Sequence, residues 1–326
     1  MPLLEIKELR IEFGRGPGAL RAVDGVSLSL EEGQTLCLVG ESGSGKSVTA
    51  LSIARLLPSP PAHYTGGSIL LQGREVLRMT SRELREIRGG TVSYIFQEPG
   101  ASLNPVFRVG WQIKETLQLH RPGAATDAEV VRLLKLVGIP APEQRMRSYP
   151  HEMSGGMQQR VMIAMAIAAH PKLLIADEPT TALDVTIQAQ IIELLQQLKA
   201  ELGMSILLIT HNLGIVGDIA DQLAVMYAGQ IVENGPAGQV LKNPLHPYTQ
   251  ALIDSVPTLG EGAERLRAIP GSVPQLSALP AGCRFHPRCG VVRPDCASES
   301  PALDWPVSGH AVRCPYCLQP AGLRTA

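Results

Sequence analysis

Apolar residues follow two patterns along the chain: short continuous runs and longer stretches in which they recur at helical spacing. A run such as Leu36–Val39 is typical of a buried strand, whereas apolar residues three to four apart are typical of a helix packed on a sheet. The runs predict strands over residues 3–13, 26–30, 36–39, 66–71, 91–96, 173–176, 205–209, 223–227 and 230–233. Helical spacing predicts helices over residues 48–57, 81–88, 112–119, 128–137, 155–169 and 185–201.

Strands that alternate with helices indicate an α/β fold with a largely parallel sheet covered on both faces. The strands near the N-terminus indicate an added antiparallel sheet, and prolines and glycines over about 98–153 separate the helices of a mostly helical insertion. After about residue 236 prolines follow in quick succession, which predicts an extension with little regular structure. We therefore expect a core over 1–235 and an extension over 236–326.

Composition narrows the class of protein. The chain has 326 residues, 44% hydrophobic, and a formal net charge of −1, so a packed core is expected and a nucleic-acid partner is not. No apolar run approaches the roughly 20 residues that span a bilayer. The first residues, Met1–Ile6, lack the basic and then apolar order of a signal peptide. These features predict a soluble cytoplasmic protein that is able to dock on a membrane partner.

The segment Gly40–Ser47, here called the phosphate loop, fits G-x-x-x-x-G-K-[ST] between the strand 36–39 and a predicted helix. Glycines allow backbone N–H groups to close around a phosphate chain, and a helix N-terminus adds partial positive charge. Lys46 is expected to reach the β- and γ-phosphates, and Ser47 to bind Mg²⁺. We assign nucleotide binding to Ser42, Gly43, Ser44, Gly45, Lys46, Ser47 and Val48.

A second candidate site begins where the apolar run Leu173–Ala176 ends in Asp177 and Glu178. In a parallel sheet this position is the carboxyl edge, beside the expected phosphate loop. Asp177 is placed to hold Mg²⁺ directly or through water, and Glu178 to polarise the water that attacks the γ-phosphate.

The segment Met153–Gln158, here called the signature segment, resembles the Leu-Ser-Gly-Gly-Gln signature of ABC transporter ATPases. Ser154, Gly155 and Gly156 open a predicted helix and form a second anion site. The resemblance implies that this segment closes over ATP bound to another subunit, so the chain acts as a dimer. Met157 stands where that family usually has Gln, so any contact that the Gln side chain makes in the family is absent here.

Further resemblance to this family covers residues 3–235. It implies that Gln97 senses Mg²⁺ and water, that residues 182–184 communicate across the dimer, and that His211 is the switch histidine. Gln97, Glu178 and His211 are thus the expected catalytic residues. Phe13 matches the aromatic residue that stacks on adenine, although a role as a core strand residue explains it nearly as well.

Longer matches point to the dipeptide/oligopeptide and nickel uptake group. They include residues 97–99, 102–105, 153–160, 178–186 and, in the extension, Asn243–Thr249 and Cys283–Cys289. The resemblance implies a peripheral ATPase on the cytoplasmic face of the inner membrane, paired with a second, similar ATPase. Two permease subunits and an extracytoplasmic binding protein are its other expected partners. The sequence does not decide between dipeptides, longer peptides and nickel, or between homodimer and heterodimer.

Five of the six cysteines lie between Cys283 and Cys317. Four thiolates satisfy either a [4Fe–4S] cluster or a tetrahedral Zn²⁺ ion. The resemblance favours a cluster on the following residues: Cys283, Cys289, Cys296 and Cys314. Zn²⁺ stays open because Cys314–Cys317 is a C-x-x-C pair in which Cys317 could replace Cys314. A set of unliganded thiols is the third alternative, and Cys37 is expected to act as a small apolar residue.

Two rival functions remain from sequence. A soluble ATPase of DNA repair or translation shares the core, but such proteins usually carry coiled-coil insertions or tandem cores, which are not visible here. A non-catalytic regulatory half is the other rival, and Glu178 and His211 argue against it.

Overall fold

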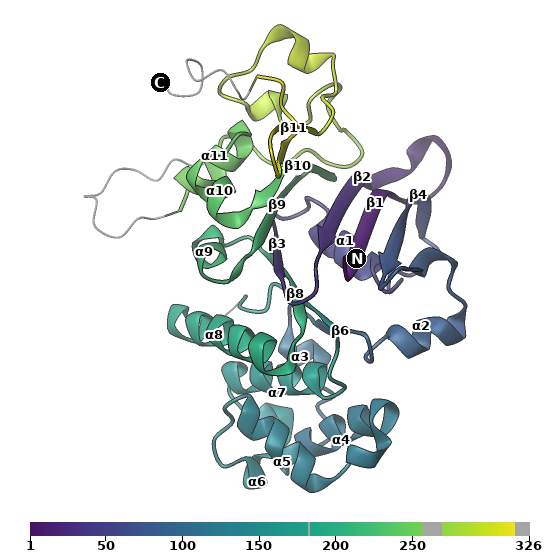
Figure 1. Cartoon of the computed structure of the whole chain (residues 1–326), viewed down its shortest axis with the longest axis vertical. Helices are drawn as coiled ribbons and strands as arrows, with labels where there is room; N and C mark the ends of the chain where they lie inside the picture. Colours follow the sequence, from purple (N-terminus) through teal and green to yellow (C-terminus); the bar gives the residue numbers. More distant parts are fainter. Residues whose placement is uncertain (182, 257–268, 317–326) are drawn as a thin grey trace, which may run out of the picture. The chain divides into compact units, whose positions relative to one another are not determined.

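The computed structural model describes residues 1–181, 183–256 and 269–316. The chain divides into two compact units, whose elements are labelled in Figure 1. The first unit holds residues 1–30, 35–77 and the described part of 210–326, and the second holds residues 31–34 and 78–209.

An antiparallel sheet opens the first unit. Its strands are β1 (Leu4–Phe13), β2 (Leu20–Leu30), β4 (Ala62–Leu71) and β5 (Arg74–Glu75), in the order β2-β1-β4-β5. Leu4 lies opposite Leu30 on one side and Leu71 on the other, and apolar residues of β1 are buried. β2 begins six residues earlier than the sequence predicts, because it pairs with β1 up to Phe13 and Leu20.

A second set of strands in the first unit runs in the order β11-β12-β10-β9-β3. These are β3 (Thr35–Val39), β9 (Gln222–Tyr227), β10 (Gln230–Pro236), β11 (Asp304–Val307) and β12 (His310–Val312). β3 and β9 are parallel, and β9 and β10 form a hairpin whose turn, Ala228 and Gly229, has positive φ at both residues.

The C-terminal strands therefore extend the sheet rather than trailing from it, as Figure 1 shows for the yellow segment beside β10. Within this contact the fully buried carboxylate of Glu233 in β10 lies 2.7 Å from His310 Nε2 in β12. The same carboxylate accepts hydrogen bonds from the backbone N–H groups of Leu245 and His246. Glu233 thus joins three segments of the unit.

The helices of the first unit are α1 (Lys46–Ser52), α9 (Val216–Ile219), α10 (Ala237–Lys242) and α11 (Pro247–Asp254). Short 3₁₀ turns cover Gly16–Gly18, Val76–Arg78, Leu213–Ile215, His286–Arg288 and Pro294–Ala297. α1 is shorter than the prediction of 48–57, since Arg55 has a φ of 50° and ends helical geometry. The expected lack of regular structure after residue 236 is wrong for residues 237–254, which form α10 and α11.

Parallel strands form the centre of the second unit, in the order β8-β7-β6. They are β6 (Val92–Ile95), β7 (Leu173–Asp177) and β8 (Ser205–Thr210), and Leu173 lies opposite both Val92 and Ser205. Leu173–Ala176 are completely buried, as expected for a strand covered on both faces. Two long helices of this unit are α7 (Gly155–Ile167) and α8 (Val185–Leu202).

Residues 99–152 contribute α3 (Pro99–Ser102), α4 (Val109–His120), α5 (Asp127–Leu136) and α6 (Pro142–Arg145), with 3₁₀ turns at Pro122–Ala124 and Pro150–Glu152. α2 (Ser81–Ile87) precedes them and begins with a capping box between Thr80 and Glu83. Figure 1 shows α4, α5 and α6 gathered beside α7. Across the described residues, none of the helices is both long enough and apolar enough to cross a bilayer. The predicted α/β fold with an added antiparallel sheet is confirmed.

Candidate functional site

The phosphate loop connects β3 to α1, and its shape depends on glycine. Gly40, Gly43 and Gly45 have φ values of 150°, 79° and 104°, a region that side chains rarely adopt. A Cβ at Gly40 would lie 2.1 Å from the carbonyl oxygen of Met226, and one at Gly45 would lie 2.6 Å from that of Ala22. The loop is therefore packed directly against the backbone of β9 and β2.

Lys46 is folded back over this loop. Its Nζ donates hydrogen bonds to the carbonyl oxygens of Gly40 at 2.8 Å and Glu41 at 2.9 Å, and the side chain is buried. Ser44 is also buried, and among the described residues its hydroxyl has no hydrogen-bond partner. Ser42, Gly43 and Ser47 are exposed. The loop thus presents backbone, hydroxyl and ammonium donors of the kind that bind phosphate.

The other predicted residues of the first unit are Phe13, Val48 and His211. Phe13 ends β1, is half-buried and lies opposite Leu20 and Ala62. Val48 is half-buried in α1, and His211 is exposed directly after β8.

In the second unit, residues far apart in sequence meet at Glu178. The Gln97 side chain donates a hydrogen bond to the Glu178 carboxylate at 3.1 Å, and the Thr181 hydroxyl donates another at 2.9 Å. Glu178 follows Asp177 at the end of β7 and has a φ of 48°, which is uncommon for a residue with a side chain. The structure therefore gathers two of the predicted catalytic residues, Gln97 and Glu178, at the carboxyl edge of the strands.

The signature segment begins α7. The Ser154 hydroxyl accepts a hydrogen bond from the Met157 N–H at 3.4 Å, and both Ser154 and Gly155 are exposed. A Cβ on Gly156 would come within 3.2 Å of Ile187, whereas one on Gly155 would meet nothing closer than 3.9 Å. In the predicted loop 182–184, Asp184 caps α8, and residue 182 lies outside the described residues.

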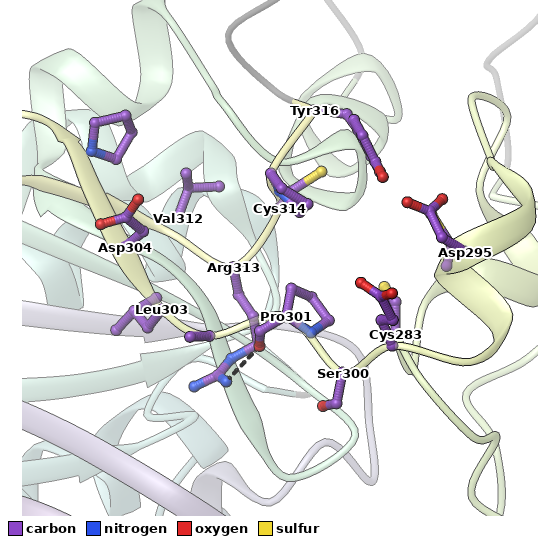
Figure 2. A pocket seen from close by; sticks show the side chains of 15 residues that line it. Cys283, Asp295, Ser300, Pro301, Leu303, Asp304, Val312, Arg313, Cys314 and Tyr316 are labelled. Atoms are coloured by element: carbon purple, nitrogen blue, oxygen red, sulfur yellow. Dashed lines mark hydrogen bonds between the residues drawn. The ribbon is translucent and has the colours of Figure 1, made fainter.

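The four cysteines Cys283, Cys289, Cys296 and Cys314 line one small cavity of about 30 Å³, together with His246 and Tyr316. Three of them also line a larger cavity of about 480 Å³, where Figure 2 shows Cys314 and Tyr316 across from Cys283 and Asp295. Burial raises the pKa of Cys283 and that of Cys289, the latter to about 11.

These thiols are chemically suited to soft metals, and a bound metal would have to displace their protons. Within 1–181, 183–256 and 269–316, however, no three His, Cys, Asp or Glu side chains are gathered closely enough to hold a single metal ion. Cys317, the alternative to Cys314, lies outside the described residues.

Sequence reasoning missed the contacts of Glu41, the second residue of the phosphate loop. Its backbone N–H donates to the Tyr248 hydroxyl, and its carboxylate accepts two hydrogen bonds from Arg288. Tyr248 and Arg288 lie in the segments Asn243–Thr249 and Cys283–Cys289, which the sequence marked only as matches to a transporter group. Separations of 207 and 247 residues hide such contacts from any local pattern.

Comparison with known proteins gives two family matches. Residues 23–181 match the ABC transporter family, and residues 232–296 match the C-terminal region of oligopeptide/dipeptide transporters. The oligopeptide transport ATP-binding protein OppD of Bacillus subtilis is 52% identical over 286 residues, 87% of this chain and 80% of its own length. AppD of the same organism, also named an oligopeptide transport ATP-binding protein, is 49% identical over 96% of both chains.

A solved structure shares the fold. The ATP-binding cassette MJ0796, a dimer in a post-hydrolysis state with ADP and phosphate, is 26% identical, with a TM-score of 0.64 over 72% of this chain and 98% of that one. The family matches, the extent of identity to OppD and AppD and the shared fold agree with the geometry of the phosphate loop. The chain belongs to the ABC transporter family of ATPases, with the C-terminal region of its oligopeptide/dipeptide group.

Proposed function

We propose that this chain is the ATP-hydrolysing subunit of an importer of dipeptides or oligopeptides. The observation that carries the proposal is a fully formed phosphate loop in a chain that is 49% identical, over 96% of its length, to an oligopeptide transport ATP-binding protein. Dipeptides, longer peptides and nickel share this type of ATPase, and the identity to OppD and AppD favours peptides.

In the proposed reaction ATP is bound by Ser42–Val48, with Lys46 moving from its carbonyl partners to the phosphates and Phe13 against the adenine. Glu178 orients and polarises the attacking water, and Gln97 and Thr181 hold the Glu178 carboxylate in place. His211 completes the site near the γ-phosphate. Hydrolysis of this kind needs positioning and charge stabilisation, with no covalent intermediate. Mg²⁺, for which Ser47, Gln97 and Asp177 are the proposed ligands, neutralises phosphate charge when bound.

The exposed signature segment supports a dimeric mechanism. Ser154, Gly155 and Gly156 leave an uncovered helix N-terminus on α7, which is suited to the γ-phosphate of ATP on another subunit. The proposed partners are a second ABC ATPase in a heterodimer, two permease subunits and an extracytoplasmic binding protein. The chain would then be peripheral, at the cytoplasmic face of the inner membrane.

We further propose that Cys283, Cys289, Cys296 and Cys314 bind a [4Fe–4S] cluster rather than Zn²⁺. A single Zn²⁺ draws four thiolates to within 2.3 Å of one point, whereas a cluster binds each thiolate through a different iron. The observation that supports the proposal is that these four thiols line one cavity. Purification without oxygen, followed by iron, sulfide and zinc assays, tests this. Zinc without sulfide, or no metal, would contradict it.

Glu178→Gln tests the ATPase assignment. The amide keeps the hydrogen-bonding shape and loses the base, so ATP binding should persist while hydrolysis falls by at least about 100-fold. Glu193→Gln, an exposed position on α8, is the matched control and should hydrolyse ATP at the parent rate. The measurement is phosphate release by the chain assembled with its partners. A normal rate in Glu178→Gln would refute the proposed mechanism.

A further inference from the structure

Glu41 is held through each of its polar groups. Its backbone N–H donates to the Tyr248 hydroxyl at 2.9 Å, and its carbonyl oxygen accepts from Lys46 Nζ at 2.9 Å. Its two carboxylate oxygens accept from the two terminal nitrogens of Arg288 at 2.7 and 2.9 Å. A single residue of the phosphate loop is therefore bound at once by the nucleotide lysine and by two residues of the C-terminal region.

Arg288 is also held in place by residues other than Glu41. Its side chain is only 5% exposed, and its Nε donates to the carbonyl oxygen of Pro270 at 2.8 Å. The guanidinium also donates to the Tyr227 hydroxyl at 3.3 Å. The hydrogen bonds to Glu41 raise the pKa of Arg288 further above its ordinary value. This two-pronged, charge-assisted pairing fixes direction as well as charge, which lysine in the same place would not.

Tyr248 is equally constrained. It is completely buried, its ring packs against Tyr227 and Phe285 with centroids 4.7 and 5.2 Å away, and its backbone N–H donates to His246 Nδ1. His246 is bound in turn to Glu233 of β10. The hydroxyl that accepts the Glu41 N–H therefore sits on a rigid support.

We propose that Arg288 and Tyr248 are positioning residues for ATP binding, acting through Glu41. Tyr248 fixes the backbone of Glu41, and with it the direction of the phosphate loop as it leaves β3. Arg288 fixes the side chain and neutralises a carboxylate that stands one residue from the loop's phosphate-binding backbone. Without Arg288 this carboxylate would be a partly buried, uncompensated negative charge beside the phosphates of ATP, which is unfavourable for an anionic ligand.

A purely structural role is the competing explanation, because the same segment is also anchored elsewhere. Arg284, four residues before Arg288, is paired with Asp24 of β2 and donates to the carbonyl oxygen of Ala228. The Arg284 side chain is also largely buried, at 10% exposed, but in the described part of the chain its hydrogen bonds go to Asp24 and Ala228 and not to the phosphate loop. It is therefore a matched control that breaks an equally buried ion pair of the same segment.

The experiment measures affinity for a fluorescent ATP analogue and thermal stability on the purified full chain. Arg288→Gln should weaken nucleotide binding by about tenfold or more, and Glu41→Gln added to it should restore most of the loss by removing the unpaired charge. Arg284→Gln should lower the melting temperature about as much as Arg288→Gln does. It should leave the affinity for the ATP analogue within about threefold of the parent. Rescue by Glu41→Gln is a result that simple loosening of the fold would not give.

The proposal is overturned if Arg288→Gln binds the analogue as the parent does, or if Arg284→Gln weakens binding equally. If Arg288→Gln does not fold, Tyr248→Phe decides the matter, since it removes only one oxygen and keeps the ring. Tyr248→Phe should raise the KM for ATP and leave kcat at saturating ATP unchanged in the assembled transporter. An unchanged KM in that variant would refute the proposal.

Discussion

The two segments for which phosphate binding is proposed, the phosphate loop and the signature segment, are built in opposite ways. The phosphate loop is enclosed by its own chain: Ser44 and Lys46 are buried, and Glu41 is held by Tyr248 and Arg288. The signature segment lies open: Ser154 and Gly155 are exposed, and the hydroxyl of Ser154 accepts a long hydrogen bond of 3.4 Å from the Met157 N–H.

This difference indicates which segment is preorganised in the isolated chain and which one depends on assembly. The backbone of the phosphate loop is held by its own chain, so ATP should bind a largely preorganised backbone, and in the proposed mechanism the Lys46 side chain is the part that moves. In the proposed mechanism the exposed donors of the signature segment bind a ligand brought by another subunit. The first segment should therefore work in the isolated chain, and the second only in an assembly.

The largest effects should come from one variant in each segment. Lys46→Ala should abolish ATP binding by the isolated chain, because it removes the cation that reaches the phosphates. Ser154→Arg should leave that binding at the parent level and reduce ATPase of the assembled transporter by about 100-fold, since it blocks closure over the other subunit's ATP.

Titration of a fluorescent ATP analogue and phosphate release, applied to both variants, give the comparison directly. If Ser154→Arg lost binding in the isolated chain, or if Lys46→Ala kept it, the two segments would not differ as described.

A smaller effect concerns stability. Gly45→Ala should lower the free energy of unfolding by about 3 kcal/mol, because its Cβ would overlap the carbonyl oxygen of Ala22 in a backbone conformation foreign to alanine. Gly155→Ala meets only Leu183 at 3.9 Å and favours the helix, so its change should stay within about 1 kcal/mol. Urea unfolding followed by circular dichroism measures both, and equal losses would contradict the contrast in packing.

The smallest effect probes the strand that enters the phosphate loop. Burial, and then the charge of Asp221, raise the pKa of Cys37 to about 12. The folded protein should therefore leave Cys37 unalkylated by iodoacetamide at pH 8, and the unfolded chain should react. The sign for stability follows: above the ordinary pKa of 9.0 only the unfolded chain loses this proton, so Cys37 disfavours the fold as pH rises. Mass spectrometry of the peptide checks the labelling, and rapid modification in the folded state would show that β3 opens readily.

The pattern of apolar residues correctly predicts those strands and helices whose formation depends on neighbouring residues. The run 173–176 and the helix 185–201 are each found within one residue of their predicted ends, because burial on both faces and helical spacing act over neighbouring residues. Prolines misled the prediction for the extension. The run of prolines predicts irregular chain, but Pro247 stands at the first position of α11, where its fixed φ suits a helix start.

The candidate site likewise has residues that the sequence identifies and contacts that only the fold reveals. Motif spacing identifies Gly40–Ser47, and the apolar run before Asp177 identifies Glu178. Spacing does not reveal that Gln97 bonds to Glu178, or that Arg288 grips Glu41, because these pairs are created by the fold across 81 and 247 residues. Glu41 occupies a position that the phosphate-loop motif leaves unspecified, so no feature of the motif singles it out.

The pairing of β12 with β10 and of Arg288 with Glu41 has a consequence for inheritance. A recombination event that joined residues 1–235 of one such ATPase to the tail of a distant relative would separate Glu41 from Arg288 and Glu233 from His310. Each half of the chimera would keep its sequence motifs, but the ion pair and the hydrogen bond that join the two halves would be lost. The extension should therefore be exchangeable only among relatives that keep both pairs, Glu41 with Arg288 and Glu233 with His310. The extension and the phosphate loop should then be inherited together.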